Sequence, residues 1–138
     1  MKVVIIYEST RGRTKAMAEA ICEGAISVGA ACTVIDAKDF NNLEDICALA
    51  VGSSTRMKNV LPMAKRVLAE LPELKGLPTA AFGSYGWSGE APDEIAARLK
   101  ALGGTLVIDQ PIKAKDYPGE QTLTDCRNLG KILASSCK

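Results

Sequence analysis

The sequence lacks histidine altogether and is poor in aromatic residues, which make up 4% of its 138 positions. Without an imidazole, the chain cannot build a Ser-His-Asp or Cys-His catalytic site, and most zinc and copper sites are excluded. The five Cys are an odd number and include no CxxC pair, which argues against a disulfide framework and against a Cys-based zinc or iron–sulfur site. We expect Cys22, Cys32 and Cys47, which lie in apolar patterns, to be small core residues.

Long hydrophobic runs and a strong charge of either sign are also missing. No apolar stretch approaches the roughly 20 residues that span a bilayer, and the first ten residues, MKVVIIYEST, lack the cleavage site of a signal peptide. The net charge of +1 favours neither nucleic acid nor a membrane as a partner. The length and the hydrophobic content of 47% predict a single domain over residues 1–138, which we expect to be cytoplasmic.

Segments typical of strands and of helices alternate along the chain. The run KVVIIY is continuously apolar, as in a strand buried on both faces. Residues 14–28 repeat apolar residues at helical spacing and stop at Gly29. Pro62 suits a first helical turn, and Thr122 is the expected N-cap of the last helix. Strands are predicted at 2–7, 32–36, 45–52, 77–82 and 105–109, and helices at 14–28, 60–71, 92–102 and 122–134, with at most a short helical turn within 37–45.

This alternation predicts an α/β fold, a doubly wound five-stranded parallel sheet of order 2-1-3-4-5 with helices on both faces. In such a sheet a ligand binds beyond the carboxyl ends of the strands, at the switch point between the first and third strands. Residues 8–14, 52–59 and 83–89 follow the first, third and fourth strands at that edge. We therefore expect these three loops to form the functional site.

The first loop, ESTRGRT, runs from a strand into the N-terminus of a helix. Such a turn offers unpaired N–H groups and the positive end of a helix dipole, and Gly12 lets the backbone approach a ligand closely. Ser9, Thr10 and Thr14 add hydroxyls, so a phosphate site is one interpretation. The alternative is an ordinary helix start that is capped by Thr10 or Thr14. The loop carries neither the GxxxxGK[ST] nor the GxGxxG pattern.

The third loop, GSYGWSG, holds Trp87, the only Trp of the chain, together with Tyr85 among small residues. An aromatic ring in a glycine-rich loop packs poorly against its neighbours, and it can offer a flat face to a planar ligand. The alternative is that Trp87 covers an edge of the apolar core.

Three segments, AFGSYGWSGEA (81–91), VGSST…N…LP (51–62) and STRGRT (9–14), resemble the flavodoxin family, and most closely the flavodoxin-like domain of A-type flavodiiron proteins. The resemblance covers nearly the whole chain. It implies a non-covalent FMN with its phosphate in 9–14 and its ring between 53–59 and 84–89, against Trp87 or Tyr85, and it implies no metal and no catalytic residue. The cofactor-binding residues so implied are Ser9, Thr10, Arg11, Gly12, Arg13, Thr14, Ser53, Ser54, Thr55, Arg56, Asn59, Ser84, Tyr85, Gly86, Trp87 and Gly89.

The phosphate segment departs from the family pattern, T-x-T-G-x-T, by placing Arg11 where a hydroxyl is usual and Arg13 where Asn is common. Typical flavodoxins surround their flavin with acidic residues, whereas these positive charges would favour an anionic, fully reduced flavin. We therefore expect a less negative second reduction potential and a redox partner with an acidic docking patch. Lys15 and Arg56, which also lie nearby in sequence, are interpreted as solvated surface charges.

The second loop departs from the family as well, because residues 53–59 contain no glycine. Flavodoxins commonly rotate a peptide in this loop when the flavin is half-reduced, and that rotation relies on residues that accept a positive φ. Among Met57, Lys58 and Asn59, only Asn59 is permissive by residue type. We therefore expect the half-reduced flavin to be poorly stabilised.

The resemblance implies an electron-transfer protein, and a chain without His cannot build the diiron centre of the flavodiiron proteins. We therefore expect a stand-alone FMN carrier, as a monomer or weak dimer, that is not an oxygen or nitric oxide reductase. One alternative is an NAD(P)H-dependent FMN reductase of flavodoxin fold, although such enzymes are longer. The other is a flavin-free interaction module. Of the nearby acids, Glu90 is expected to interact favourably with the positive end of the dipole of the helix predicted at 92–102.

Overall fold

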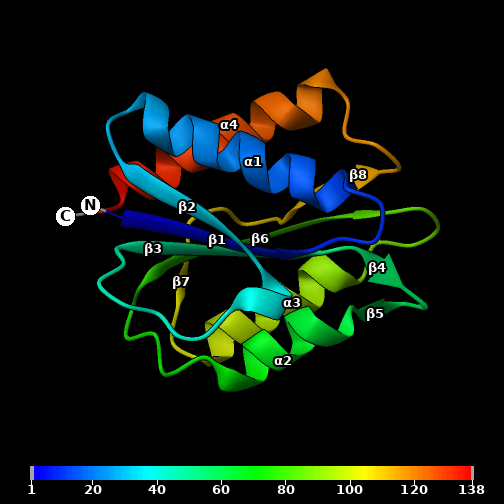
Figure 1. The fold of residues 1–138 in the computed structure, drawn as a ribbon, viewed down its shortest axis with the longest axis horizontal. Coiled ribbons are helices and arrows are strands. Elements are labelled where there is room, and N and C mark those ends of the chain that lie inside the picture. The colour runs from blue at the N-terminus through cyan, green and yellow to red at the C-terminus, as the bar shows by residue number, and fades with distance from the viewer. Residues whose placement is uncertain (1, 138) are drawn as a thin grey trace.

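The structure is a computed structural model that describes residues 2–137. A parallel sheet forms the middle layer, with α1 and α4 on one face and α2 and α3 on the other (Figure 1). No helix within the described range combines the length and the apolar character that a membrane span needs. The strands are β1 (Lys2–Glu8), β2 (Ala31–Asp36), β3 (Ala48–Ser53), β4 (Thr55–Arg56), β5 (Asn59–Val60), β6 (Pro78–Tyr85), β7 (Thr105–Leu106) and β8 (Ile112–Lys115), and the helices are α1 (Arg13–Ser27), the 3-10 turn η1 (Ala37–Asp39), α2 (Pro62–Glu70), α3 (Ala91–Ala101) and α4 (Glu120–Ser135).

The strand order confirms the prediction of a doubly wound sheet. The path is β2-β1-β3-β6-β7, all parallel, with β8 also paired to β6. In chain order of the main strands, this is 2-1-3-4-5. The first strand is buried on both faces because its side chains alternate between two cores: Val3 and Ile5 pack with α1 and α4, whereas Val4 and Ile6 pack with α2 and α3.

The fifth strand is split, so the single strand predicted at 105–109 is wrong. Only Thr105–Leu106 pairs as β7; the chain then bends away from the sheet and returns after Pro111 as β8, where Ile112 pairs with Phe82. Val107 and Ile108 remain apolar because they pack against the α1–α4 core, not because they lie in a strand. The alternating segment IKAK was not predicted as a strand.

Two helix starts differ from the prediction by two residues. Helix α4 begins at Glu120 with Gly119 as N-cap, so Thr122 lies inside the helix and is not its cap. Helix α2 begins at Pro62, which lies in the first turn as predicted, but Val60, predicted to be helical, belongs to strand β5. The interval 37–45 holds only η1, as expected.

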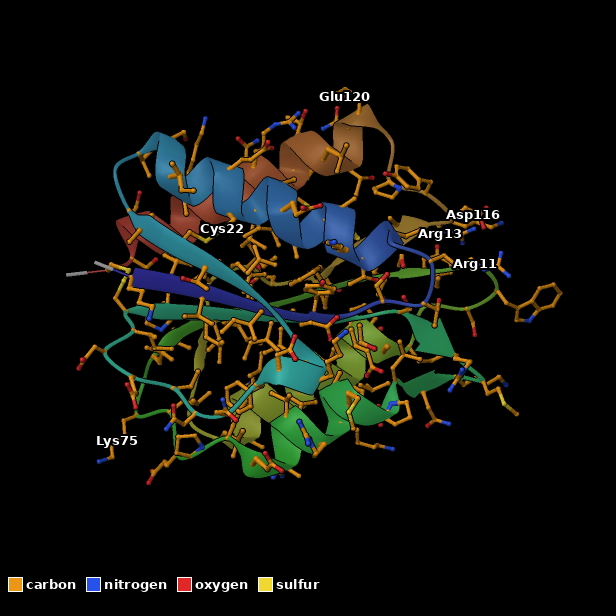
Figure 2. The ribbon with its side chains drawn as sticks, in the orientation of Figure 1. Arg11, Arg13, Cys22, Lys75, Asp116 and Glu120 are labelled. Carbon is orange, nitrogen blue, oxygen red and sulfur yellow. A yellow bond between two sulfur atoms is a disulfide. The ribbon has the colours of Figure 1, made fainter. Side chains whose placement is uncertain are left out.

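Four of the five Cys form disulfides, which corrects the expectation that the cysteines are unpaired core residues. Cys22 of α1 is bonded to Cys32 of β2, and Cys47 is bonded to Cys137, while Cys126 is free and buried. Figure 2 labels Cys22 on α1. The Cα atoms of the bonded pairs are 5.6 and 5.1 Å apart. An odd count of Cys could not reveal this pairing, because bonding depends on which Cα atoms the fold brings together.

Candidate functional site

The three predicted loops do meet at one edge of the sheet. The parallel register sets Glu8, at the end of β1, opposite Ser53, at the end of β3. A hydrogen bond joins the two chain segments at this point, because the Ser54 N–H donates to the Glu8 carbonyl at 3.2 Å. Figure 1 shows the start of α1, the β4–β5 hairpin and the end of β6 at the same end of the molecule. This is the switch-point edge, where ligands bind in doubly wound sheets.

A buried cluster of three hydroxyls joins the loops. Thr14 Oγ1 lies 2.8 Å from Ser84 Oγ and 3.0 Å from Ser54 Oγ, and it accepts the Ser84 backbone N–H at 3.3 Å. Ser54 Oγ and Ser84 Oγ are 3.4 Å apart. Thr14 is fully buried in the first turn of α1, Ser54 follows β3, and Ser84 lies near the end of β6, so the cluster fixes the three predicted loop segments relative to one another.

The first loop ends at Gly12, which is the N-cap of α1 and has a φ of 80°. Helix α1 has no side-chain cap and no acidic residue in its first turn, so the alternative of a cap by Thr10 or Thr14 is wrong. Ser9 Oγ is buried and has no hydrogen-bond partner within residues 2–137. An uncapped helix N-terminus beside a partnerless hydroxyl fits a phosphate group, whose oxygens would accept from both.

The second loop is a β-hairpin, in which β4 and β5 are joined by Met57 and Lys58. These two residues have φ values of 51° and 65°, as a two-residue type I′ turn requires. The expectation that Asn59 would be the permissive position is therefore wrong: Asn59 lies in β5, and its Nδ2 donates to the Met57 carbonyl at 3.0 Å. A hairpin twist demands the left-handed conformation at the turn, whatever residues occupy it.

The other hydroxyls of the second loop hold this hairpin in place. Ser53 Oγ donates to the Ser54 carbonyl at 2.8 Å and accepts from the Leu61 N–H at 3.0 Å. Thr55 Oγ1 accepts the Ala91 N–H at the start of α3 at 3.0 Å. The hairpin is thus anchored to β3 and α3 before any ligand arrives.

The third loop begins later than predicted, because β6 extends to Tyr85 and includes Ser84. Trp87 is 93% exposed, so it does not cover the apolar core and that alternative is wrong. Tyr85 is half-buried and packs on Gly89, where an added Cβ would lie 3.0 Å from the Tyr85 ring. The indole is free to contact a planar ligand or a protein partner.

A fourth loop, residues 116–119 after β8, also lies at this edge and was not predicted from the sequence. The Asp116 N–H donates to the Tyr85 carbonyl at 2.7 Å, and its carboxylate forms an ion pair with Arg13 at 3.5 Å. Tyr117 is 65% exposed. The turn residues DYPG were a visible signal, but they could not be placed because strand β8 itself was not predicted.

The structure thus gathers the sequence-predicted residues at one edge in three kinds of environment. Two acids at this edge have structural positions. Glu8, at the end of β1, accepts the Ala64 N–H of α2 at its Oε1 at 2.7 Å. Glu90, which follows the third loop, is the N-cap of α3 and has one buried carboxylate oxygen that lacks a partner among the described residues. Thr14, Ser53, Ser54 and Ser84 are buried; Ser9, Arg13, Thr55, Tyr85 and Gly89 are half-buried; Thr10, Arg11, Gly12, Arg56, Asn59, Gly86 and Trp87 are exposed.

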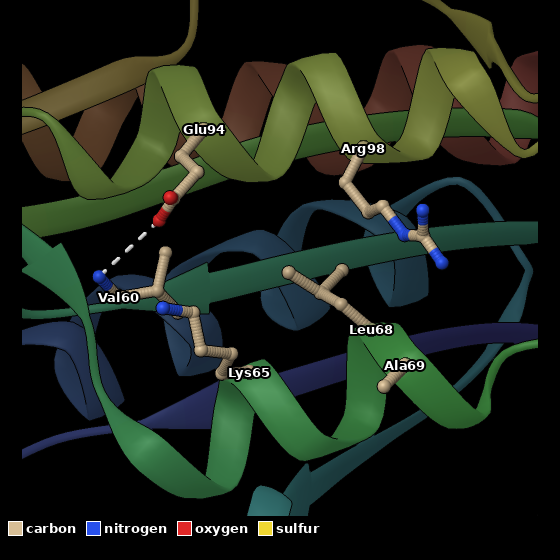
Figure 3. A pocket seen from close by; sticks show the side chains of 6 residues that line it. All are labelled: Val60, Lys65, Leu68, Ala69, Glu94 and Arg98. Atoms are coloured by element: carbon tan, nitrogen blue, oxygen red, sulfur yellow. Dashed lines mark hydrogen bonds between the residues drawn. The ribbon is translucent and has the colours of Figure 1, made fainter.

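A separate cavity of about 230 Å³ lies between α2 and α3 (Figure 3). At one end of it the Glu94 carboxylate accepts the Val60 N–H at 3.4 Å. The lining residues are Val60, Lys65, Leu68, Ala69, Glu94 and Arg98, none of which belongs to the sequence-predicted site. The candidate site is therefore an open edge formed by loops, distinct from this cavity.

A doubly wound parallel sheet with a phosphate-fitting loop and an aromatic loop at its switch point defines a nucleotide-binding α/β protein. Comparison with known families makes this specific. Residues 5–130 match the flavodoxin family, and the chain belongs to that family. Flavodoxins bind FMN, and the partnerless Ser9 hydroxyl and the uncapped start of α1 fit its phosphate.

Individual relatives include both short flavodoxins and longer proteins. A flavodoxin from the domain Archaea is 40% identical, with a TM-score of 0.88 over 98% of this chain and 97% of that chain. The flavodiiron protein from Giardia intestinalis is 26% identical, with a TM-score of 0.90 over 98% of this chain and 36% of its own. The anaerobic nitric oxide reductase flavorubredoxin of Vibrio vulnificus is 34% identical over 96% of this chain and 28% of its own length. The chain spans well under half the length of the curated relatives that it matches.

Proposed function

We propose that this protein is an FMN-dependent electron carrier that performs no substrate chemistry of its own. The observation that carries the proposal is the buried Thr14–Ser54–Ser84 cluster. Its hydrogen bonds hold the three loop segments of a flavodoxin site in fixed positions relative to one another. FMN, when bound, accepts and donates electrons, and the protein supplies binding, orientation and electrostatics.

Residues 9–14 would hold the phosphate through the N–H groups of α1 and the Ser9 hydroxyl. The β4–β5 hairpin and the loop after β6 would enclose the flavin ring, with Tyr85 and Trp87 as its aromatic neighbours. The hydrogen bonds at Ser53 and Thr55 support this arrangement. They hold both strands of the hairpin in place, so that only the turn residues beside the flavin ring are left to move.

The partner surface is inferred from side chains that face solvent at this edge. Met57, Trp87 and Tyr117 are 87%, 93% and 65% exposed, and they come from three different loops. Such exposed apolar groups at one end of a molecule are typical of interaction sites. Arg11, Lys15, Arg56 and Lys58 are exposed and form no ion pair within residues 2–137. A redox partner with an acidic patch around an apolar centre complements this surface.

The same cations bear on the reduction potential. Asp116 already neutralises Arg13, so Arg11 is the unpaired guanidinium of the first loop. We expect the exposed cations at this edge as a group, with Arg56 and Lys58 of the hairpin among them, to favour the anionic, fully reduced flavin and to make the second reduction potential less negative than in flavodoxins with acidic surroundings. A potentiometric titration that gives a very negative second couple would contradict this.

We further propose that the domain acts as a stand-alone carrier. The near-complete overlap with an archaeal flavodoxin supports this. The alternative of an NAD(P)H-dependent FMN reductase would be favoured if the purified, FMN-loaded protein oxidised NADH or NADPH without a partner. The alternative of a flavin-free module would be favoured if the protein bound no FMN.

A flavin titration tests the first part of the proposal. FMN added to the apoprotein is expected to shift the visible flavin band and to quench the fluorescence of Trp87, the only Trp, at one FMN per chain. A Trp87→Phe variant serves as the control, because the band shift should persist without the fluorescence signal. Absence of both changes in the wild type, even with excess FMN, would sink the proposal.

Electron transfer is then measured with two small acceptors of opposite charge. The reduced, FMN-loaded protein should reduce ferricyanide, an anion, faster at low salt than at high salt, because the exposed cations attract it. Hexaammineruthenium(III), a cation, should show the opposite salt dependence. Equal salt dependence for both acceptors would remove the basis for an acidic partner.

A further inference from the structure

The two arginines of the first loop have different surroundings. Arg13, at the first position of α1, is half-buried, and its Nη1 lies 3.5 Å from Asp116 Oδ1. Arg11 is exposed and has no ion-pair partner in the part of the chain that the structure describes. Figure 2 shows Arg11, Arg13 and Asp116 at the same end of the molecule. Only one of the two guanidinium groups is therefore uncompensated.

The carboxylate that compensates Arg13 is held by its own loop. The Asp116 N–H donates to the Tyr85 carbonyl at 2.7 Å, and Asp116 has a φ of 60°, which Asp tolerates better than most residues. Its Oδ1 also lies 3.9 Å from the position that a Cβ on Gly86 would take. The backbone of Asp116 is thus held beside the end of β6, and its carboxylate, which is 63% exposed, faces Arg13.

The neutral groups of the first loop are already partly used. The Thr14 hydroxyl is hydrogen-bonded to Ser54, to Ser84 and to the Ser84 backbone, so Ser9 is the buried hydroxyl that lacks a partner. A guanidinium binds a phosphate through short, charge-assisted hydrogen bonds, often two at once. In this loop such a group stands at residue 11, next to Gly12 at the start of α1.

We propose that Arg11 is the charged group that selects the phosphate of FMN, and that Asp116 withholds Arg13 from the same task. The inference rests on the FMN binding of the proposed function. This chain then distinguishes FMN from riboflavin, which lacks the phosphate, by charge in addition to neutral hydrogen bonds. The preference for FMN over riboflavin weakens at high salt, because salt screens the attraction between Arg11 and the phosphate.

The test compares the dissociation constants of FMN and riboflavin for the apoprotein at low and high NaCl. Arg11→Ala should weaken FMN binding about ten- to a hundred-fold and leave riboflavin binding unchanged. Arg11→Lys should retain part of the preference, because it keeps the charge but loses the planar fork. Asp116→Asn should tighten FMN binding several-fold, since it frees Arg13, with riboflavin again unchanged. Arg98→Ala, an exposed arginine on α3, is the matched control and should change neither constant.

Equal losses for the two flavins in Arg11→Ala, no loss for FMN, or weaker FMN binding in Asp116→Asn would each overturn the inference. The proposed function fails separately. A protein that binds FMN with these preferences but transfers no electrons leaves the inference standing, whereas a wild-type protein that binds neither flavin refutes both.

Discussion

Gly24 of α1 and Gly130 of α4 bring the two helices into direct backbone contact. A Cβ on Gly24 would lie 1.8 Å from the Arg127 carbonyl oxygen, and a Cβ on Gly130 would lie 1.8 Å from the Ile21 carbonyl oxygen. Neither helix can yield at that point without moving its backbone. The reciprocal pair therefore sets how closely α4 packs on α1, the helix that begins at the phosphate loop.

Replacement of either glycine by Ala should destabilise the protein. We expect Gly24→Ala or Gly130→Ala to lower the free energy of unfolding by about 1–3 kcal/mol, as overpacking does, even though Ala favours a helix. Urea unfolding measures this. Gly119→Ala is the matched control, because nothing lies within 4 Å of its Cβ position and its φ is −80°. A neutral result for both helix glycines would contradict the close contact.

The hydroxyl cluster should contribute to stability as well as to the site. Thr14→Val keeps the shape of the side chain but leaves the Ser84 N–H without its acceptor. The expected cost is about 1–3 kcal/mol, the penalty for an unsatisfied buried polar group, together with weaker FMN binding. Thr33→Val, at an exposed position of β2, should cost little. If the two variants are equally stable in urea, the hydrogen bonds of the cluster do not contribute to the free energy of unfolding.

The β4–β5 turn stores backbone strain because Met57 and Lys58 both adopt positive φ. Lys58→Gly should raise the free energy of unfolding by about 1 kcal/mol, since glycine adopts this conformation without a Cβ clash. It should also increase the amount of one-electron-reduced FMN seen at half-reduction, because the turn peptide can rotate. Arg56→Gly, in the same hairpin but without a positive φ, should be destabilising instead. An absorption spectrum during stepwise reduction measures the second effect.

The disulfides predict a defined thiol count. Alkylation of the denatured, unreduced protein should modify one of the five Cys, which peptide mapping should identify as Cys126. In the native protein this thiol should resist modification, because burial raises its pKa to about 12. After reduction under denaturing conditions, alkylation should modify all five Cys.

Stability should fall on reduction, because the two bonds close loops with sequence separations of 10 and 90 residues. The loop-entropy relation gives about 3 kcal/mol for the shorter loop and about 4–5 kcal/mol for the longer one. Cys22→Ser and Cys47→Ser variants separate the two contributions in thermal unfolding. Unchanged unfolding after complete reduction would show that neither bond stabilises the fold.

Tyr7 gives the protein a pH dependence in the alkaline range. Burial, followed by the charges of Asp36 and Glu19, raises the pKa of Tyr7 above its ordinary value of 10.0. The folded state therefore holds the phenol proton more tightly than the unfolded state. Its contribution is complete below pH 10 and is lost as the pH rises through the raised pKa of the folded state.

Absorbance at 295 nm should include a late component, from Tyr7, that ionises above the ordinary Tyr pKa of 10.0. Tyr7→Phe should remove that late component and flatten the loss of stability above pH 10. Tyr117→Phe, at an exposed position, is the control and should leave both in place. If the late component survives in Tyr7→Phe, the assignment is wrong.

The general fold could be predicted because strand and helix patterns are local. The continuous run in β1 and the helical spacing in α1 follow from side chains that are close in sequence. The parallel order and the site edge then follow from general rules of connection. The three loops were located for the same reason, since each directly follows a strand.

Details that depend on distant residues could not be predicted. The split between β7 and β8 depends on where β6 offers a free edge, and the type I′ turn at Met57 depends on the twist of its hairpin. The Cys22–Cys32 bond depends on how α1 lies along β2. None of these leaves a distinctive pattern in the sequence.

The sequence by itself therefore determined the layers, the strand order and the place of the site, because periodicity and chain connection are properties of neighbouring residues. Only the tertiary structure decided the partners within that frame. It joined Thr14 to Ser54 and Ser84, set Asp116 against Arg13, and left Trp87 in solvent. Hydrogen bonds, ion pairs and exposure are set by distances in space, and distances between residues far apart in the chain exist only once it has folded.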